Sequence, residues 1–338
     1  MGDYWFHYLE DKVAGYLLTL SENYPAPLLK ACATNVESLT DILSQASIGV
    51  VGVDNQFVLP VGEGVVIKAT NFHSNQGVFI LVNDGSSSGS EVTLKDLITE
   101  QYYSFSDVKA MLSSWQATKI IVEELVGGVL PDEYKLHVVD GQVIAIDIIM
   151  DRGTDCPCYA VVDEDFNRLD YNGCFEPSGS IQQIFDVDKP VCTAIDFSIG
   201  ASSAGPVKKD MYLCSNVKKP KQCVFDDMIT IAESLSKTIG VYMRIDMFVV
   251  GDQVYVQEYS ANPMNGLRHC ASKVDGNGCI DSCFMGREFK AAGSPFGGNI
   301  TATPDVLNGF LVKDAASQCE LANQADPALM TFKSSCIR

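Results

Sequence analysis

The sequence predicts an α+β fold in which antiparallel hairpins alternate with amphipathic helices. Two hairpins are expected at residues 133–152 and 244–262, where alternating apolar residues flank an Asp-Gly and a Gly-Asp turn, respectively. Residues 225–239 repeat apolar side chains at helical spacing, which predicts an amphipathic helix just before the second hairpin. Strand-like alternation also runs through residues 48–82. These patterns place the chain in the α+β class.

The remaining elements follow from the same kinds of pattern. In chain order we expect helices over residues 1–47, strands over 48–82, a helix over 92–116, a short buried strand over 119–126 and irregular structure over 153–223. Pro25 and Pro27 interrupt the first helical stretch, because proline cannot continue a helix.

Acidic residues occupy strand positions inside the hairpin at residues 244–262. Asp246 lies in its first strand and Glu258 at the end of its second, so pairing of the strands would bring both carboxylates together. Burying a carboxylate without a partner is costly, and two like charges need a cation between them. Oxygen ligands in that arrangement suit Mg²⁺. For this stretch alone, two solvent-facing carboxylates on an amphipathic hairpin are the alternative.

Composition narrows the class of protein. The chain has 338 residues and is 46% hydrophobic, which is enough for a full core in one large or two smaller domains. Its formal net charge of −19 argues against a nucleic-acid partner. No apolar run reaches the roughly 18 residues of a membrane span. The first residues lack the apolar core of a signal peptide, so a leader either does not exist or lies outside this sequence.

Cysteines are numerous and unevenly placed. Of the 12 cysteines, all but Cys32 lie between residues 156 and 336, and none forms a C-x-x-C pair. This spacing argues against a tetrahedral zinc site, and the even number predicts disulfides. We therefore expect a secretory or extracellular setting, with a cytoplasmic one as the alternative.

The order of the elements and their charged residues resembles the ATP-grasp superfamily. The matching order is helix, strand–loop–strand, helix, buried strand with an acidic end, lysine-bearing hairpin, helix and acidic hairpin, over roughly residues 11–266 with residues 153–223 inserted. The closest branches are those of teichuronopeptide biosynthesis and of S6-glutamate-ligase-like enzymes. The resemblance implies an ATP-grasp fold whose two α/β subdomains sandwich the nucleotide.

The resemblance also implies the organisation of the chain into parts. These are a helical N-terminal segment at 1–60, an N-terminal grasp subdomain at 61–126, a C-terminal grasp subdomain at 127–266 with a cysteine-containing insertion at 153–223, and a Cys/Gly-rich extension at 267–338.

The same resemblance assigns residues that would bind the phosphates of ATP. Lys12 matches the first nucleotide lysine of the family, with an exposed helix lysine as the alternative, and Lys68 is expected to face the α- and β-phosphates. The loop from Asn71 to Gly77 takes the place of the glycine-rich phosphate lid. It departs from the family because only one glycine remains, which puts fast ATP turnover in doubt.

Residues that would bind the nucleoside follow in the chain. Glu123 is expected to face the exocyclic amine of adenine, although a buried strand that ends in solvated acids would have the same sequence. The base is expected to lie against the backbone of the next residues, Glu124, Leu125 and Val126. Glu133, or Asp132 beside it, falls where the family has its ribose-binding acid.

Catalytic and metal-binding roles fall on the two hairpins. The resemblance assigns Lys135, Arg152 and Arg244 to the transferred phosphoryl group. It assigns Mg²⁺ to Asp246, Glu258 and Asn262, although the asparagine of the family usually lies two residues after the glutamate, where this sequence has Ser260. Arg268 is expected to bind an anionic group of the substrate.

The resemblance therefore implies an ATP- and Mg²⁺-dependent ligase that joins a carboxylate to an amine, or to another nucleophile, through an acyl phosphate. One alternative is a kinase of the same fold that phosphorylates a sugar or protein hydroxyl. The other is a non-catalytic secreted module that keeps the fold. The expected partner is a small-molecule, peptide or glycan acceptor, with no nucleic acid and no membrane span.

Overall fold

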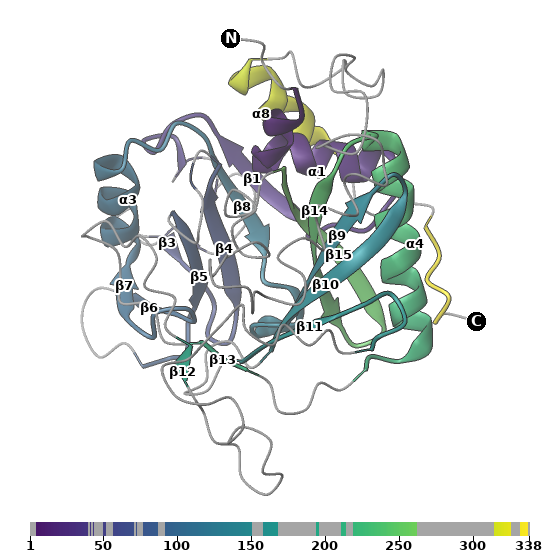
Figure 1. Ribbon diagram of the computed structural model, residues 1–338. Coiled ribbons are helices and arrows are strands. Elements are labelled where there is room, and N and C mark those ends of the chain that lie inside the picture. Colours follow the sequence, from purple (N-terminus) through teal and green to yellow (C-terminus); the bar gives the residue numbers. More distant parts are fainter. Residues whose placement is uncertain are drawn as a thin grey trace, which may run out of the picture.

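The computed structural model contains two sheets side by side, with α3 beyond one sheet and α4 beyond the other (Figure 1). The structure describes residues 5–39, 41, 43, 50–51, 57–70, 72, 77–86, 92–150, 158–167, 194–195, 211–213, 219–261, 314–325 and 332–336. Helices and mainly antiparallel sheets in one chain confirm the predicted α+β class.

The first sheet has six antiparallel strands in the order β1-β8-β4-β5-β6-β7. The strands are β1 (Leu29–Ala33), β4 (Gly64–Ala69), β5 (Val78–Val82), β6 (Thr93–Asp96), β7 (Tyr102–Ser104) and β8 (Ile120–Glu124). Helix α3 (Phe105–Ser114) starts directly after β7, because Ser104 and Asp107 form a capping box there. Val108 and Leu112 of α3 pack into the core of this sheet. A separate pair of short strands joins β2 (Val50–Val51) to β3 (Phe57–Val58).

The second sheet has seven strands in the order β12-β13-β11-β10-β9-β14-β15. The strands are β9 (Asp132–Val139), β10 (Gln142–Met150), β11 (Cys158–Val162), β12 (Ala194–Ile195), β13 (Met211–Leu213), β14 (Met243–Val250) and β15 (Gln253–Ser260). The pairs β9–β10 and β14–β15 are the two predicted hairpins. Asp140 and Gly141 both have positive φ, as a tight two-residue turn requires.

The two faces of the second sheet differ in chemistry. The residues of β9 that pack in the core with α4 (Gln222–Ile239) are apolar, namely Tyr134, Leu136 and Val138. Alternate residues of a strand point to opposite faces. Glu133, Lys135 and His137 therefore point away from α4, and yet all three are buried. Burying polar groups costs free energy, so a buried polar face is a candidate functional site.

Two helices from distant parts of the chain lie at the joint between the sheets. Helix α1 (Lys12–Ser21), which follows the 3₁₀ turn η1 (Trp5–Glu10), packs against β15 of the second sheet. The approach is close, because a Cβ on Gly15 would lie 2.7 Å from the Tyr259 ring. Helix α8 (Ala315–Gln324) packs against both α1 and β1. The two helices thus connect the second sheet to the first.

Among the described residues, two disulfides hold the C-terminal part of the chain. Cys32 of β1 is bonded to Cys319 of α8, and Cys223 of α4 is bonded to Cys336. The backbone N–H of Ser335 also donates to the Asp227 carboxylate of α4, at 3.0 Å and 3.1 Å. The expectation of disulfides is confirmed for these four cysteines.

Two predictions of helix were wrong in part. Residues 29–33, within the stretch expected to be helical, form β1, because they pair with the edge of β8. Residues 93–96 and 102–104 form β6 and β7, and only residues 105–114 of the expected helix are helical. Tyr102 and Tyr103 favour strands, and Glu100 has a φ of 59°, which a helix does not allow. Tertiary pairing overrode the local helical pattern in both places.

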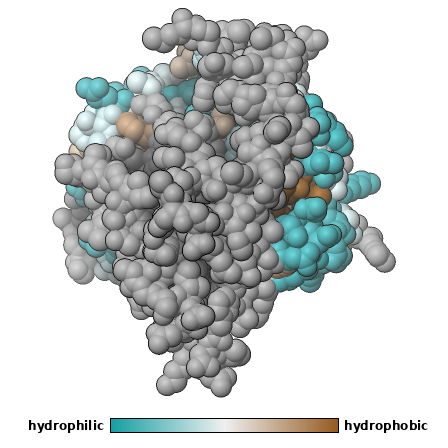
Figure 2. Space-filling model, viewed as in Figure 1, coloured by the Kyte–Doolittle hydropathy of each residue, from teal (hydrophilic) through white to brown (hydrophobic). Residues whose placement is uncertain are grey.

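The described helices give no candidate for a membrane span, since none combines sufficient length with sufficient apolar character. In Figure 2, the described residues visible on the side of α4 are largely hydrophilic, with a small hydrophobic area among them.

We predict that replacing Cys223 and Cys336 together by serine lowers the free energy of unfolding by about 2–5 kcal/mol, because the disulfide closes a long loop and restricts the unfolded chain. Urea unfolding of the oxidised protein measures this change. A loss below about 1 kcal/mol would show that the hydrogen bonds of Ser335 hold the tail without the disulfide.

Candidate active site

Strand register brings charged residues of the second sheet into one row. Asp246 of β14 lies opposite Lys135 of β9 on one side and opposite Glu258 of β15 on the other. Opposite residues on paired antiparallel strands point to the same face, so the three side chains share the face that α4 does not cover. Asp246 and Glu258 are thus opposite each other, as the hairpin pattern predicts.

A β-bulge makes this arrangement possible. Met247 pairs with Val256 but Asp246 pairs with Glu258, so Gln257 is an extra residue on β15. Val256 and Tyr259 can therefore both lie in the core, which strict alternation would forbid. Without the bulge, Gln257 would lie opposite Asp246 and Glu258 would point toward the core.

Asp246 is the centre of the row, and it bonds two cations. Arg244 holds its carboxylate with two hydrogen bonds, Nε to Oδ1 at 2.6 Å and Nη2 to Oδ2 at 2.8 Å, and Lys135 Nζ lies 2.5 Å from Oδ2. Burial by itself would raise the pKa of Asp246, but the charges of Arg244 and Lys135 hold that pKa below its ordinary value. Burial likewise works to lower the pKa of Arg244, and the Asp246 carboxylate reverses this, so that pKa is raised. Asp246 and Arg244 are therefore both charged.

Lys135 also bonds a second carboxylate. Its Nζ lies 2.7 Å from Glu133 Oε1, two residues earlier on the same face of β9. Glu133 is 3% exposed, so of the two acids considered for the ribose it is the one that lies in the buried charged row. The structure thus brings four predicted site residues together on the second sheet, and Glu258 lies at the end of the row.

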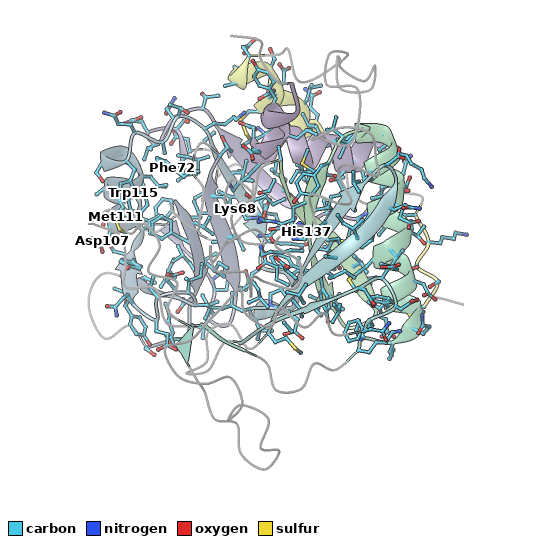
Figure 3. The ribbon with its side chains drawn as sticks, viewed as in Figure 1. Lys68, Phe72, Asp107, Met111, Trp115 and His137 are labelled. Atoms are coloured by element: carbon cyan, nitrogen blue, oxygen red, sulfur yellow. A yellow bond between two sulfur atoms is a disulfide. The ribbon has the colours of Figure 1, made fainter. Side chains whose placement is uncertain are left out.

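The first sheet contributes a buried ion pair of its own. Lys68 of β4 and Glu123 of β8 lie on adjacent strands, and Lys68 Nζ is 2.5 Å from Glu123 Oε2. Their exposed fractions are only 2% and 4%. In the view of Figure 3, Lys68 lies on the side of the first sheet nearer the second, and His137 lies on the side of the second sheet nearer the first. The predicted phosphate lysine and the predicted adenine acid are therefore neighbours.

The predicted hinge follows Glu123 directly and runs beside the second sheet. Glu124 Oε1 accepts a hydrogen bond from the Leu28 N–H at 3.1 Å. Leu125 precedes the 3₁₀ turn η2 (Val126–Gly128), where Gly127 adopts a φ of 73°. A Cβ on Gly127 would lie 2.8 Å from the Val250 side chain at the end of β14. This close approach requires glycine and fixes the hinge against the second hairpin.

Lys12 links the row on the second sheet to the loop after β4. Its Nζ donates to the Phe72 carbonyl at 3.1 Å and lies 3.7 Å from Glu258 Oε1. The Phe72 ring makes an edge contact with Trp115, which follows α3. Gly77 closes the loop with a φ of 71°, and its carbonyl accepts the N–H of Ala69. Lys12 is 5% exposed, so it is not the surface lysine that the sequence left as an alternative.

Sequence reasoning missed a second buried set beside the row. His137 Nδ1 lies 2.8 Å from the Tyr242 hydroxyl, and His137 Nε2 lies 3.3 Å from Asp147 Oδ2. His137 is opposite Arg244 in the register, and Asp147 is opposite Lys135. Burial raises the pKa of Tyr242 far above its ordinary value, so it is a neutral hydroxyl. The sequence could have revealed this set, because His137 and Asp147 are polar residues within apolar strands, as Asp246 is.

The remaining predicted residues are Asn71, Arg152, Asn262 and Arg268, and they lie outside the described residues. Within the described part of the chain, no three His, Cys, Asp or Glu side chains form a group that could hold a metal ion. Asp246 and Glu258 thus form a two-carboxylate set. Their role as metal ligands stays a prediction.

Comparison with known proteins gives a likeness in structure only. No family model matches the sequence, and no curated protein matches it. D-alanine–D-alanine ligase from Bacillus anthracis in complex with ATP is 14% identical, with a TM-score of 0.36 over 75% of this chain and 54% of the ligase. The ATP-grasp ligase PsnB with a minimal precursor is 12% identical, with a TM-score of 0.35 over 76% and 52%.

A third solved structure is N5-carboxyaminoimidazole ribonucleotide synthetase in its ADP complex. It is 12% identical, with a TM-score of 0.42 over 88% of this chain and 55% of the synthetase. The structures that resemble this chain include ATP-grasp ligases. The chain spans about half the length of these proteins.

We predict that Asp246→Asn lowers the free energy of unfolding by about 3–5 kcal/mol, because it leaves Arg244 and Lys135 buried without their shared anion. Urea unfolding measures the loss. In the double variant with Arg244→Met, the total loss should fall short of the sum of the single losses by about 1–3 kcal/mol. Losses that add to within about 0.5 kcal/mol would show that the two side chains do not stabilise each other.

Proposed function

We propose that this chain is an ATP-dependent ligase that binds ATP with Mg²⁺ between its two sheets and joins a carboxylate to an amine. The observation that carries the proposal is the buried row in which Arg244 and Lys135 both bond Asp246. Such a row adds little to stability, because desolvating charged groups costs about as much as their attraction returns. Buried charges of this kind are therefore typical of functional sites.

The cations of the site suit a polyphosphate. Four basic side chains with little exposure are available, namely the buried Lys12, Lys68 and Lys135 and the 13%-exposed Arg244, and each lies near a carboxylate. A phosphate oxygen can replace a carboxylate oxygen as hydrogen-bond acceptor, so binding would exchange one charged partner for another. We assign Lys12 and Lys68 to the α- and β-phosphates, and Lys135 and Arg244 to the phosphoryl group that is transferred.

The nucleoside is proposed to bind at the hinge after β8. Glu123 would accept from the exocyclic amine of adenine, the backbone of residues 124–126 would line the base, and Glu133 would bind the ribose. The burial of Glu123 and its position just before the hinge support this assignment. Outside the described residues, we propose Asn71 for the phosphate loop, Arg152 for the phosphoryl group and Arg268 for an anionic substrate.

The chemistry would proceed in two displacements. An oxygen of the substrate carboxylate attacks the γ-phosphorus, the bond to the β-phosphate oxygen breaks, and ADP leaves. The amine nitrogen then attacks the acyl carbon, phosphate leaves, and the nitrogen loses a proton. Arg244 and Lys135 would stabilise the charge on the transferred phosphoryl oxygens, because a phosphate oxygen can take the place of the Asp246 carboxylate oxygen as their acceptor.

The acidic residues fit Mg²⁺ that arrives with the nucleotide. Asp246 and Glu258 are hard oxygen donors opposite each other, and Mg²⁺ in nucleotide sites is commonly held by one or two carboxylates plus phosphates. Asp246 and Glu258 would hold the ion, with Asn262 as a third ligand. The bound ion supplies neutralisation of the phosphate oxygens. Because Asp246 bonds Arg244 and Lys135, those cations must turn toward the phosphates before Asp246 is free for the metal.

Two disulfides in the structure support an oxidising compartment, which we propose as the setting. We propose a small-molecule, peptide or glycan acceptor, and a place near the teichuronopeptide-biosynthesis and S6-glutamate-ligase-like branches.

We predict that the wild-type protein binds ATP with Mg²⁺ and that Lys68→Met weakens binding at least about tenfold, because the substitution removes a buried phosphate partner. Calorimetry measures both. Lys221→Met is the matched control, because it breaks an exposed Lys–Asp pair at the end of β14–β15. Equal losses in both variants would contradict the role of Lys68.

Product analysis then separates the ligase from its alternatives. With ATP and a pool of carboxylate and amine acceptors, a ligase releases ADP and phosphate in equal amounts with an amide. A stable phosphoester in place of free phosphate would show a kinase. Failure of the folded, disulfide-bonded protein to bind ATP would show a module without this activity.

A further inference from the structure

Lys119 is a buried lysine to which the preceding site gives no role. It lies just before β8 and is 5% exposed. Its Nζ contacts Asp11 Oδ2 at 2.7 Å and donates to Gln318 Oε1 at 2.6 Å. Its backbone carbonyl accepts the Thr70 N–H at 2.9 Å. One residue thus joins α1, α8 and the end of β4.

Two of these contacts lead to the proposed phosphate lysines. Asp11 is the N-cap of α1, where its Oδ1 accepts the N–H groups of residues 13 and 14, and Lys12 is the next residue. Thr70 follows Lys68 by two residues at the end of β4. Lys119 therefore fixes the start of the helix that carries Lys12 and the end of the strand that carries Lys68.

Lys12 lies on a helix and Lys68 in the first sheet, so the separation of the two lysines has to be set by contacts between that helix and that sheet. Helix α1 packs on β15 of the second sheet, whereas β4 is in the first. The bond from Lys12 to the Phe72 carbonyl lies at the same joint. Because the Lys119–Asp11 pair is largely shielded from water, it stabilises this spacing more than a surface pair would.

Helix α8 holds Lys119 from the other side. Gln318 precedes Cys319, which is bonded to Cys32 of β1. The Asn323 side chain pairs with the backbone of Cys32, accepting its N–H at 2.8 Å and donating to its carbonyl at 3.3 Å. Asn323 thus covers the open edge of β1, and the disulfide fixes Gln318 opposite Lys119.

We propose that Lys119 is a positioning residue that sets the separation of Lys12 and Lys68, and that α8 keeps Lys119 in place through Gln318. The inference rests on the proposed function, because it assigns both lysines to ATP phosphates. Lys119 itself is assigned no phosphate, because its proposed role is to hold Asp11 and Gln318 through Nζ.

The test compares nucleotide binding in three variants. Lys119→Met should raise the Kd for ATP with Mg²⁺ about tenfold or more and change kcat much less, because misplaced lysines weaken ground-state phosphate binding. Gln318→Leu should raise the Kd in the same direction, whereas Gln318→Glu keeps the acceptor for Lys119 and should stay close to wild type. Lys221→Met, which breaks an exposed pair, is the control for loss of a lysine charge.

Each outcome decides the proposal. If Lys119→Met is folded and its Kd lies within about twofold of wild type, the positioning role is wrong. If Lys119→Met does not fold, Gln318→Leu against Gln318→Glu decides, and equal affinities would overturn the proposal.

If the wild-type protein does not bind ATP, the proposed function fails. Hydrogen exchange then tests only whether Lys119 fixes the start of α1. In that case Lys119→Met should speed exchange in the first turn of α1, where Asp11 loses its lysine partner, and Lys221→Met should not. Unchanged exchange would then overturn the role of Lys119.

Discussion

The shared bond of Arg244 and Lys135 to Asp246 is the interaction that fixes the charged face of the second sheet. Each of these charges would be costly to bury alone, and the three are stable because they lie on adjacent strands in register. The bulge at Gln257 adds Glu258 to the same face while Val256 and Tyr259 remain in the core. One face of the sheet is thus apolar and packs against α4, and the other face carries the charged residues.

The joint between the sheets depends on a few long-range contacts. Lys12 reaches both the loop after β4 and Glu258, and Lys119 connects the same helix to β4 and α8. The disulfide of Cys32 makes α8 part of this joint, although α8 comes from the far end of the chain. The proposed nucleotide site would need such fixed contacts, because phosphate ligands from both sheets would have to meet one nucleotide.

Local patterns in the sequence predicted the hairpins, α4 and the opposed carboxylates, because strand alternation and turn residues act over short distances. The same reasoning missed β1, whose strand state comes from pairing with β8, and the two strands before α3. His137 and Asp147 carried a readable signal, as polar residues within apolar strands. No sequence pattern pointed to Lys119, because its partners Asp11 and Gln318 are far away in sequence. Only the fold brings the three residues together.

In the proposed function, phosphates would draw Arg244 and Lys135 away from Asp246 and so open the metal site. Electron paramagnetic resonance of Mn²⁺, titrated into the protein with and without a non-hydrolysable ATP analogue, tests it directly. We expect a protein-bound Mn²⁺ signal only with the analogue, and a weaker one in Glu258→Gln. Tight Mn²⁺ binding without nucleotide, or a signal with the analogue that matches the Mn²⁺–nucleotide complex in water, would contradict the account.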